Sequence, residues 1–229
     1  MPKITLPTGK DKEIFVREMF NSISPTYDRL NRIMTFRLDQ HWRKESLTRL
    51  AINPGSTILD LACGTGDFVK LARLHGFQCV GADFSFGMLS NSRLSSDLVA
   101  CNAQSLPFTQ NTFDAVTCGF ALRNFVELLP VFEELGGVLK PGGRIALLEV
   151  AQPSSRISRL GHNFYFNYIV PFIGGILSDK KAYSYLPASV NYLPPVATIV
   201  EMLAKSGFSN ISHELLTTGA AQLFTATKA

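Results

Sequence analysis

"LDLACGTGDF", residues 59–68, joins an apolar run to a turn with two glycines and then to a helical pattern. A glycine-rich turn between a strand and a helix lets a ligand approach the backbone closely, and the free N–H groups of the helix N-terminus lie just beyond it. The stretch therefore predicts a strand, a ligand-binding loop and a helix at the edge of a parallel sheet.

The segments around this loop alternate between two patterns. Apolar runs predict strands at residues 57–62, 79–83, 98–101, 115–119 and 145–150, and the segments between them predict helices at 66–75, 85–95 and 127–139. Pro141, Gly142 and Gly143 predict a tight turn before the fifth strand, and the chain ends with a helix at 195–206 and strands at 210–216 and 221–227. This order is typical of an α/β fold with helices on both faces of a parallel sheet.

The length of 229 residues and the order of the segments predict a single domain with four parts. Residues 1–52 form a cap of helices, in which Ser24 and Pro25 are expected to begin the second helix. Residues 53–151 form the ligand-binding core, residues 152–194 form a lid, and residues 195–229 supply the last helix and strands.

Composition excludes several classes of protein. The net charge of +4 is spread thinly, with adjacent basic pairs only at Arg43–Lys44 and Lys180–Lys181, so it does not by itself indicate nucleic-acid binding, although it suits a surface near anionic lipid. The four cysteines form no C-x-x-C pair and lack histidines at metal-ligand spacing. We expect reduced core thiols, no bound metal and no nucleic-acid partner.

Hydropathy predicts a cytoplasmic protein. The first 20 residues contain no uninterrupted apolar region of the kind a signal peptide needs. The most apolar stretch, Phe164 to Leu177, is shorter than the roughly 20 residues of a membrane span and contains Pro171 and two glycines. Peripheral contact with the inner face of a membrane stays open.

The acidic residue before the glycine turn distinguishes between nucleotide ligands. The motif is D-x-x-x-G-x-G, with Asp60, Gly64 and Gly66, whereas the third glycine of a dinucleotide-binding loop is replaced by Val69. A carboxylate suits a ligand with an amino group and would repel a pyrophosphate. S-adenosyl-L-methionine has an amino group, a sulfonium cation and no phosphate, so it is the predicted cofactor.

Other strand ends carry residues that fit the same cofactor. Asp83 follows about 20 residues on, where an acidic side chain can accept both ribose hydroxyls, and Asn102 with Ala103 can hold an adenine edge. The alternative is that Gly64 and Gly66 only form a tight turn. The predicted cofactor-binding set is Asp60, Gly64, Thr65, Gly66, Asp83, Asn102, Ala103 and Gly119.

Several motifs together resemble class I methyltransferases, and more closely the UbiE/MenG family, which C-methylates polyprenyl quinols. They are "YDRLNRIMTFRLDQHWRK" (27–44), the glycine loop, "ADFSFGML", "NAQSLPFTQNTFDAVT", "FALRNF", "VLKPGGRIALLEV" and "AYSYLPASV" (182–190). The resemblance implies a Rossmann-like, mostly parallel sheet of seven strands. It also implies methylation of demethylmenaquinol in menaquinone biosynthesis, with another phenol or a benzoquinol as the alternative acceptor.

The chain departs from the family pattern at four positions. Asp39 stands where many members have histidine, Gly137 where they have arginine, and Ala151 where they have serine. Gly119 replaces a serine that is common at the end of the fourth strand, so a hydroxyl contact to the cofactor would be lost. These changes weaken the acceptor assignment more than the cofactor assignment.

Arg123 and Asn124, just past the fourth strand, are the predicted catalytic residues. Arg123 could stabilise the phenolate of a quinol or activate a water, since a free arginine is a poor base. The alternative is a structural ion pair. Tyr27, Asp28, Asp39 and His41 are candidates to line the site, and a surface or helix-capping role is the alternative for His41.

Two other functions and the role of the predicted lid are also considered. Cys118 occupies the region of the nucleophile of RNA cytosine methyltransferases, but Thr117 precedes it instead of proline, which favours a buried thiol. A cofactor-binding protein without catalysis is the second rival. The aromatic stretch 164–177 predicts a wall for the tail of a lipid-soluble quinol, with core packing as the alternative, and a homodimer stays open.

Overall fold

The computed structural model describes residues 7–94, 97–151, Tyr185 and 188–229. Within them lies a seven-stranded sheet of order β3-β2-β1-β4-β5-β7-β6. Its strands are β1 (Thr57–Leu61), β2 (Gln78–Asp83), β3 (Leu98–Ala100), β4 (Phe113–Gly119), β5 (Leu139–Val150), β6 (Phe208–Leu216) and β7 (Ala221–Lys228). The first five strands run parallel, and β7 pairs antiparallel with both β5 and β6. The predicted seven-stranded, mostly parallel sheet is confirmed.

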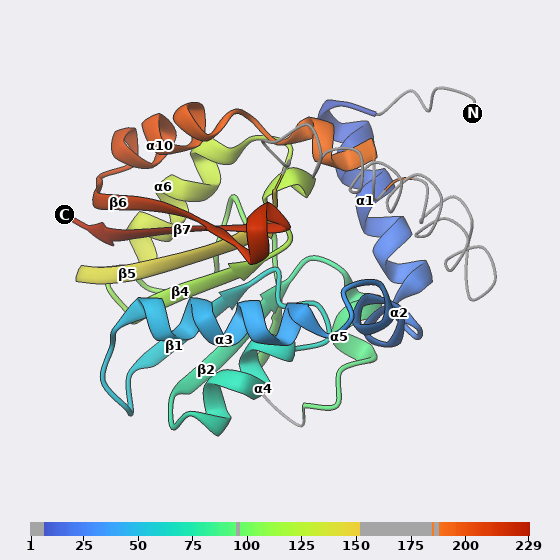
Figure 1. Ribbon diagram of the computed structural model, residues 1–229, viewed down its shortest axis with the longest axis horizontal. Coiled ribbons are helices and arrows are strands. Elements are labelled where there is room, and N and C mark those ends of the chain that lie inside the picture. Colours follow the sequence, from blue (N-terminus) through green and yellow to red (C-terminus); the bar gives the residue numbers. More distant parts are fainter. Residues whose placement is uncertain (1–6, 95–96, 152–184, 186–187) are drawn as a thin grey trace.

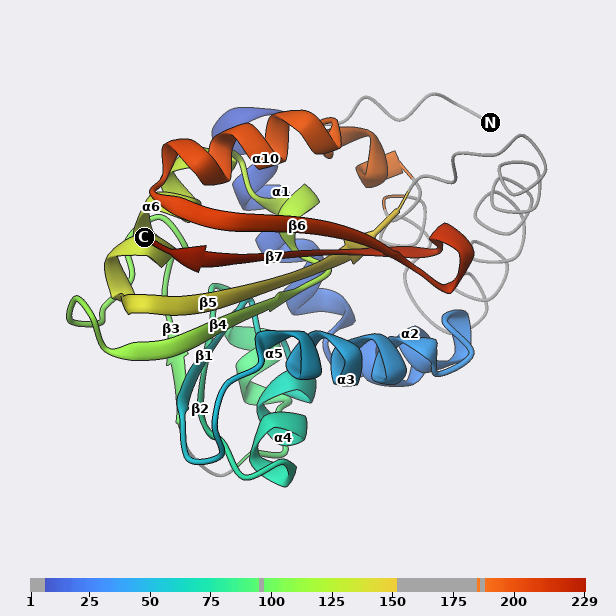
Figure 2. The ribbon, with the colours of Figure 1, turned by 60° about the vertical axis from the view of Figure 1, so that its left-hand side comes forward.

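Helices cover both faces of this sheet (Figures 1 and 2). On one side lie α6 (Leu128–Val138) and α10 (Val196–Lys205), and on the other lie α3 (Leu38–Leu50) and α4 (Asp67–Leu74). The two faces bury separate apolar clusters, one around Phe132 and Leu203 and one around Trp42 and Phe68. Because β1 is buried on both faces, its sequence is almost continuously apolar rather than alternating.

The N-terminal helices close the carboxyl end of the sheet. Helix α1 (Gly9–Ile23) packs with α2 (Tyr27–Met34) and the short helix α5 (Phe86–Ser90) around the buried ring of Tyr185. The side-chain oxygen of Asn21 accepts hydrogen bonds from the Gly87 N–H and the Ser85 hydroxyl, each at 2.8 Å. A Cβ atom at Gly87 would lie 2.8 Å from the Asn21 Cα, so the absence of a side chain permits this close approach. Within the described residues, the short 3₁₀ helices η1 (Leu122–Asn124), η3 (Val190–Tyr192) and η4 (Thr217–Gly219) connect other elements.

Three local predictions are wrong. Helix α5 ends at Ser90 instead of residue 95, because the Asn91 side chain donates to the Gly87 carbonyl (2.9 Å) and the Ser92 hydroxyl donates to the Thr65 carbonyl (2.8 Å), which replaces helical bonding. Ser24 does not begin the second helix, since its hydroxyl donates to the Asn21 carbonyl and Thr26 holds the N-cap position.

The fifth strand also begins earlier than predicted. Leu139 pairs with Phe113, the register then shifts, and Arg144 pairs with Ala115. The turn at Pro141 to Gly143 therefore lies inside an irregular strand rather than before it. The predicted lid falls largely outside the described residues.

Removing the Phe132 ring should destabilise the fold. Its side chain is fully buried on α6, so Phe132→Ala should lower the free energy of unfolding by about 3 to 5 kcal/mol. Urea unfolding without cofactor measures this change. Glu133→Ala, at an exposed position on the same helix, is the control and should change stability by less than about 0.5 kcal/mol. A loss of under 1 kcal/mol for Phe132→Ala would contradict this packing.

Candidate active site

A cleft opens at the carboxyl ends of β1, β2 and β4, with about 1010 Å³ of empty space, its solvent-filled mouth included. Seven of the predicted site residues line it: Gly64, Thr65, Asp83, Asn102, Ala103, Gly119 and Asn124. Parallel strands bring residues that are far apart in sequence to one edge of the sheet, as predicted.

Asp83 is fixed at the end of β2 by backbone donors. The Gly64 N–H donates to one carboxylate oxygen at 2.7 Å, and the Ser85 N–H donates to the other at 2.8 Å. Burial raises the pKa of Asp83, and these backbone hydrogen bonds oppose that shift. Because each carboxylate oxygen can accept more than one hydrogen bond, Asp83 retains acceptor capacity toward the cleft.

The two glycines of the loop serve different purposes. Gly64 has a φ of +58°, and a Cβ atom there would meet no described residue within 4 Å, so this side of its backbone is open to a ligand. Gly66 has a φ of +92°, but a Cβ atom there would lie 2.3 Å from the Leu94 Cδ1. Gly66 is not among the described residues that line the cleft, and its lack of a side chain makes room for Leu94.

Side chains around the loop are held by short contacts. The Thr65 hydroxyl donates to the Asp28 carboxylate at 2.5 Å, which ties the loop to α2. Asn102 accepts a hydrogen bond from the Gln104 N–H at 2.9 Å, and the resulting turn presents Asn102 and Ala103 to the cleft. Three strand ends are therefore organised around one cleft.

Asp60 lies behind the cleft rather than on its described lining. It sits opposite Thr117 in the β1–β4 pairing, and the Thr117 hydroxyl donates to its Oδ1 at 2.9 Å. Its Oδ2 atom is buried and has no hydrogen-bond partner among residues 7–94, 97–151, 185 and 188–229. Burial raises its pKa to about 7, although the nearby Arg43 charge and the Thr117 bond lower it. A contact of Asp60 with the amino group of a ligand stays a prediction.

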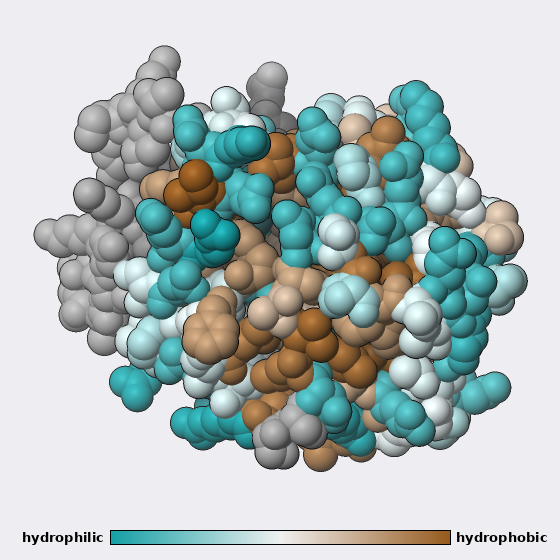
Figure 3. Space-filling view, turned by 180° about the vertical axis from the view of Figure 1, so that it is seen from behind, coloured by the Kyte–Doolittle hydropathy of each residue, from teal (hydrophilic) through white to brown (hydrophobic). Residues whose placement is uncertain are grey.

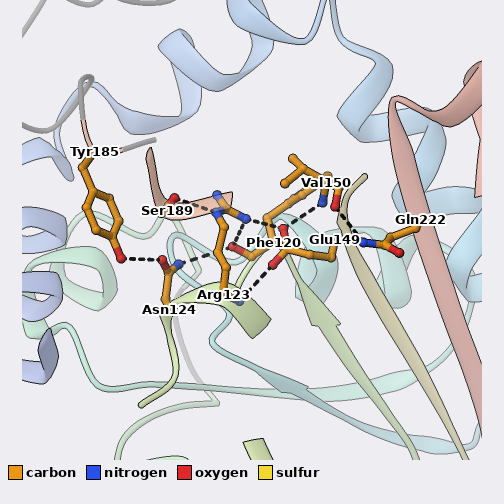
Figure 4. Close-up of polar contacts among 8 residues, drawn as sticks. All are labelled: Phe120, Arg123, Asn124, Glu149, Val150, Tyr185, Ser189 and Gln222. Carbon is orange, nitrogen blue, oxygen red and sulfur yellow. Dashed lines mark hydrogen bonds and ion pairs between the residues drawn. The ribbon is translucent and has the colours of Figure 1, made fainter. Parts of the chain in front are cut away.

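Arg123 is engaged by the protein (Figure 4). Its Nη1 pairs with the buried carboxylate of Glu149 and donates to the Phe120 carbonyl at 2.9 Å, while its Nε donates to the Ser189 hydroxyl at 3.1 Å. Arg123 is buried and is not among the described lining residues. This placement matches the structural ion pair that the sequence left open, and a direct contact with an acceptor stays a prediction.

Asn124, by contrast, lines the cleft. Its side-chain amide donates to the Phe120 carbonyl at 3.4 Å, and its oxygen accepts from the Tyr185 hydroxyl at 3.2 Å (Figure 4). Burial raises the pKa of Tyr185, so this hydroxyl stays protonated and able to donate. The orientation of Asn124 is therefore set before any ligand binds.

Of the residues in the N-terminal helices that were predicted to line the site, some line the cleft and others do not. Tyr27 lines the cleft, and burial raises its pKa. Asp28, Asp39 and His41 do not belong to the described lining. Asp39 is buried and accepts hydrogen bonds from the Thr35 hydroxyl and the Gln40 amide, whereas His41 is exposed.

Arg43 is a lining residue that the sequence analysis missed. Only 6% of it is exposed, and its guanidinium carbon lies 4.8 Å and 5.4 Å from the ring centres of Phe68 and Phe120. The available signal was helical spacing, because Arg43 shares the buried face of α3 with Asp39 and Leu47. It also explains Gly119, where a Cβ atom would lie 2.8 Å from the Arg43 Nη1 and from the Phe68 ring.

Thiol and metal chemistry find no support in the described residues. Cys118 is buried in β4, and burial raises its pKa well above the ordinary value, which disfavours the thiolate that a nucleophile requires. Within the described ranges no group of three histidine, cysteine or acidic side chains is placed to hold a metal ion.

The lining fits S-adenosyl-L-methionine better than a dinucleotide. A buried carboxylate at Asp83 can accept hydroxyl donors, and the open face of Gly64 allows close approach. Among the described ionisable groups that line the cleft, the carboxylates of Glu13, Asp67 and Asp83 outnumber the single guanidinium of Arg43. Such a balance disfavours a polyphosphate.

The strand order, the glycine loop after β1 and the acidic end of β2 define a class I methyltransferase. More particularly, the chain belongs to the ubiE/COQ5 methyltransferase family, whose model matches residues 8–228. Membership makes the chain a methyltransferase that uses S-adenosyl-L-methionine.

Named relatives agree with this assignment. The chain is 36% identical to the ubiquinone/menaquinone biosynthesis C-methyltransferase UbiE of Geobacter sulfurreducens, over 99% of this chain and 93% of that protein. It is 37% identical to the demethylmenaquinone methyltransferase of Roseiflexus castenholzii, over 97% of each. A solved structure of Haemonchus contortus phosphoethanolamine N-methyltransferase 2 in complex with S-adenosyl-L-methionine shares the fold, with a TM-score of 0.59, 18% identity and coverage of 81% of this chain and 52% of that one.

Loss of the Asp83 carboxylate should weaken cofactor binding. Asp83→Ala removes a charge-assisted acceptor, so the affinity for S-adenosylhomocysteine should fall about 10- to 100-fold. Isothermal titration calorimetry measures the affinity, with Asp97→Ala, an exposed acid that pairs with Arg73, as the control. Unchanged affinity in Asp83→Ala would remove Asp83 from the cofactor site.

Asp60 should make the stability of the unliganded protein depend on pH. Its folded pKa of about 7 exceeds the ordinary 3.8, so the folded state binds more protons between these values and the free energy of unfolding falls as pH rises through them. Asp60→Asn should therefore raise that free energy at pH 8 by roughly 2 to 4 kcal/mol, and by little near pH 4. Urea unfolding at both pH values measures the gain. An equal gain at both, or none, would contradict the raised pKa.

Proposed function

We propose that this chain transfers a methyl group from S-adenosyl-L-methionine to a ring carbon of demethylmenaquinol, which yields menaquinol in menaquinone biosynthesis. The observation that carries the proposal is the near full-length similarity to relatives named for this reaction, at 36–37% identity. The cleft supports it, because it combines the predicted cofactor residues with an apolar region that includes Phe20, Phe84 and Phe125.

The reaction requires a nucleophilic ring carbon beside an electrophilic methyl group. The sulfonium of the bound cofactor supplies the methyl group. The chain must hold the quinol ring in line, allow its hydroxyl to lose a proton, and keep water out. Aromatic and aliphatic side chains along the cleft suit the ring and exclude water, and Tyr27 and Asn124 supply polar contacts among them.

Within this proposal Asn124 contacts the acceptor and Arg123 positions Asn124. Both side chains donate to the same Phe120 carbonyl, and Arg123 anchors that turn to Glu149 at the end of β5. The Asn124 amide can then orient the acceptor hydroxyl or a water beside it. Arg123 acts through the turn, since its guanidinium already has three protein partners.

Because the proposed acceptor is lipid-soluble, we infer that the enzyme works as a peripheral protein at the cytoplasmic face of a membrane. No helix among the described residues is long and apolar enough to cross a bilayer. The turn after α2 supports contact with lipid, because Phe36 is 75% exposed and lies beside the exposed Arg37. Apolar groups also appear among hydrophilic ones on the rear face (Figure 3). The stretch 164–177 with Lys180 and Lys181 lies outside the described residues, and a homodimer stays a prediction.

Identification of the methylated product tests the proposed function. The chain would be incubated with labelled S-adenosyl-L-methionine and, in parallel, demethylmenaquinol, a demethylated benzoquinol, a simple phenol and RNA. We expect label on a ring carbon of the naphthoquinol, as located by mass spectrometry. Exclusive labelling of the benzoquinol or phenol would change the acceptor, and labelling of RNA alone, or cofactor binding without turnover, would overturn the proposal.

The two residues of the turn should respond differently to truncation. Asn124→Ala should lower the turnover number about 10- to 100-fold while the affinity for S-adenosylhomocysteine stays within about twofold, because it removes a contact to the acceptor alone. Arg123→Ala should also lower the free energy of unfolding by about 3 to 5 kcal/mol, because it leaves Glu149 charged and buried. Kinetics, calorimetry and urea unfolding separate the effects, with the exposed Asn53→Ala as control. If Arg123→Ala unfolds with unchanged free energy, Arg123 does not hold the turn, and a direct role in catalysis would be favoured instead.

A further inference from the structure

Arg43 is a buried cation whose Nε has no hydrogen-bond partner among the described residues, and we propose that its guanidinium binds the carboxylate of the methionine part of the cofactor. The proposal concerns cofactor binding alone, so it does not depend on which acceptor is methylated. It rests on the burial of Arg43, on its place in the cleft and on the order of the strands.

Burial makes the free guanidinium significant. Only 6% of Arg43 is exposed, and its Nε has no hydrogen-bond partner in the part of the chain that the structure describes. Contacts with the faces of Phe68 and Phe120 supply some favourable electrostatics but accept no conventional hydrogen bond. Because an arginine stays charged in proteins, an unpaired buried guanidinium is costly unless a ligand completes its hydrogen bonding.

The acids near Arg43 do not satisfy it. Asp60 is close enough for the Arg43 charge to lower its pKa, but within the described part of the chain no hydrogen bond or ion pair joins them, and the Asp60 Oδ2 is itself unpartnered. Asp67 lines the same cleft, but its carboxylate already accepts from Arg32 at 2.9 Å and from Gln40 at 3.1 Å. Arg43 therefore remains available to an anionic group that enters the cleft.

Strand order indicates which part of the cofactor reaches Arg43. The adjacent strands β3, β2, β1 and β4 present, in that order, Asn102 with Ala103, Asp83, the glycine loop and Gly119. If the adenine lies at β3 and the ribose at β2, the amino-acid part extends over β1 and β4. Arg43 lies there, because its Nη1 would be 2.8 Å from a Cβ atom at Gly119. The anionic group in that half of the cofactor is its carboxylate.

Among the described residues that line the cleft, Arg43 is the one with a permanent positive charge. Arg123, the other buried arginine of this region, is paired with Glu149. The family motif also explains the location, since Arg43 follows Trp42, whose indole N–H donates to the Thr217 hydroxyl at 2.8 Å and fixes this part of α3 against the C-terminal strands. The guanidinium is thus positioned before the cofactor binds.

Affinities for two ligands test the proposal without measuring catalysis. The ligands are S-adenosylhomocysteine and its decarboxylated analogue, which keeps the amino group. Arg43→Met should lower the affinity for S-adenosylhomocysteine about 10- to 100-fold, as measured by calorimetry. It should change the affinity for the decarboxylated analogue by less than about threefold. Lys44→Met removes an exposed cation from the next position and should leave both affinities unchanged.

Specific outcomes would overturn the proposal. An equal loss of affinity for both ligands would mean that Arg43 shapes the cleft without contacting the ligand carboxylate. Unchanged affinity for S-adenosylhomocysteine, with methyl transfer reduced, would place Arg43 at the acceptor instead. Arg43→Lys keeps a cation and should therefore retain part of the difference in affinity between the two ligands. If Arg43→Met does not fold, the affinities of Arg43→Lys for the two ligands are compared instead.

Discussion

The site depends on the hydrogen bond between the Gly64 N–H and the Asp83 carboxylate, which joins the end of β1 to the end of β2. This bond shapes the glycine loop and fixes the carboxylate at the same time. Parallel pairing makes it possible, because the register that sets Asp60 opposite Gly81 brings both strand ends to one edge. The half of the cleft in which we propose that the cofactor binds is thus formed by the fold before any ligand binds.

The half of the cleft in which we propose that the acceptor binds is organised by a different constraint, the distribution of buried charge. Arg123 is neutralised by Glu149, and this pair fixes the turn after β4 that presents Asn124. Arg43 and Asp60 are buried nearby, and each has one polar atom without a hydrogen-bond partner within the described ranges. Buried groups of this kind reduce stability, and they are common where a protein must recognise a charged or polar ligand. One arginine therefore maintains the structure, and the other is available to a ligand.

The sequence predicted what strand order and spacing determine. The strands, Asp83, Asn102 and the open backbone at Gly64 follow from strand-end positions in an α/β fold, and the structure places them in one cleft. Side-chain partners were not predictable: Glu149 lies in an apolar run, and only the β4–β5 register brings it to Arg123. For the same reason the sequence could not show that Gly66 accommodates Leu94, or that Gly119 leaves room for Arg43.

A crystal structure of the chain with S-adenosylhomocysteine tests most directly whether the cofactor lies across the ends of β3, β2, β1 and β4. The account predicts both ribose hydroxyls within hydrogen-bond distance of the Asp83 carboxylate, the adenine beside Ala103, and the ligand carboxylate on the Arg43 guanidinium. A ribose that points away from Asp83, with the amino-acid part remote from β4, would contradict it.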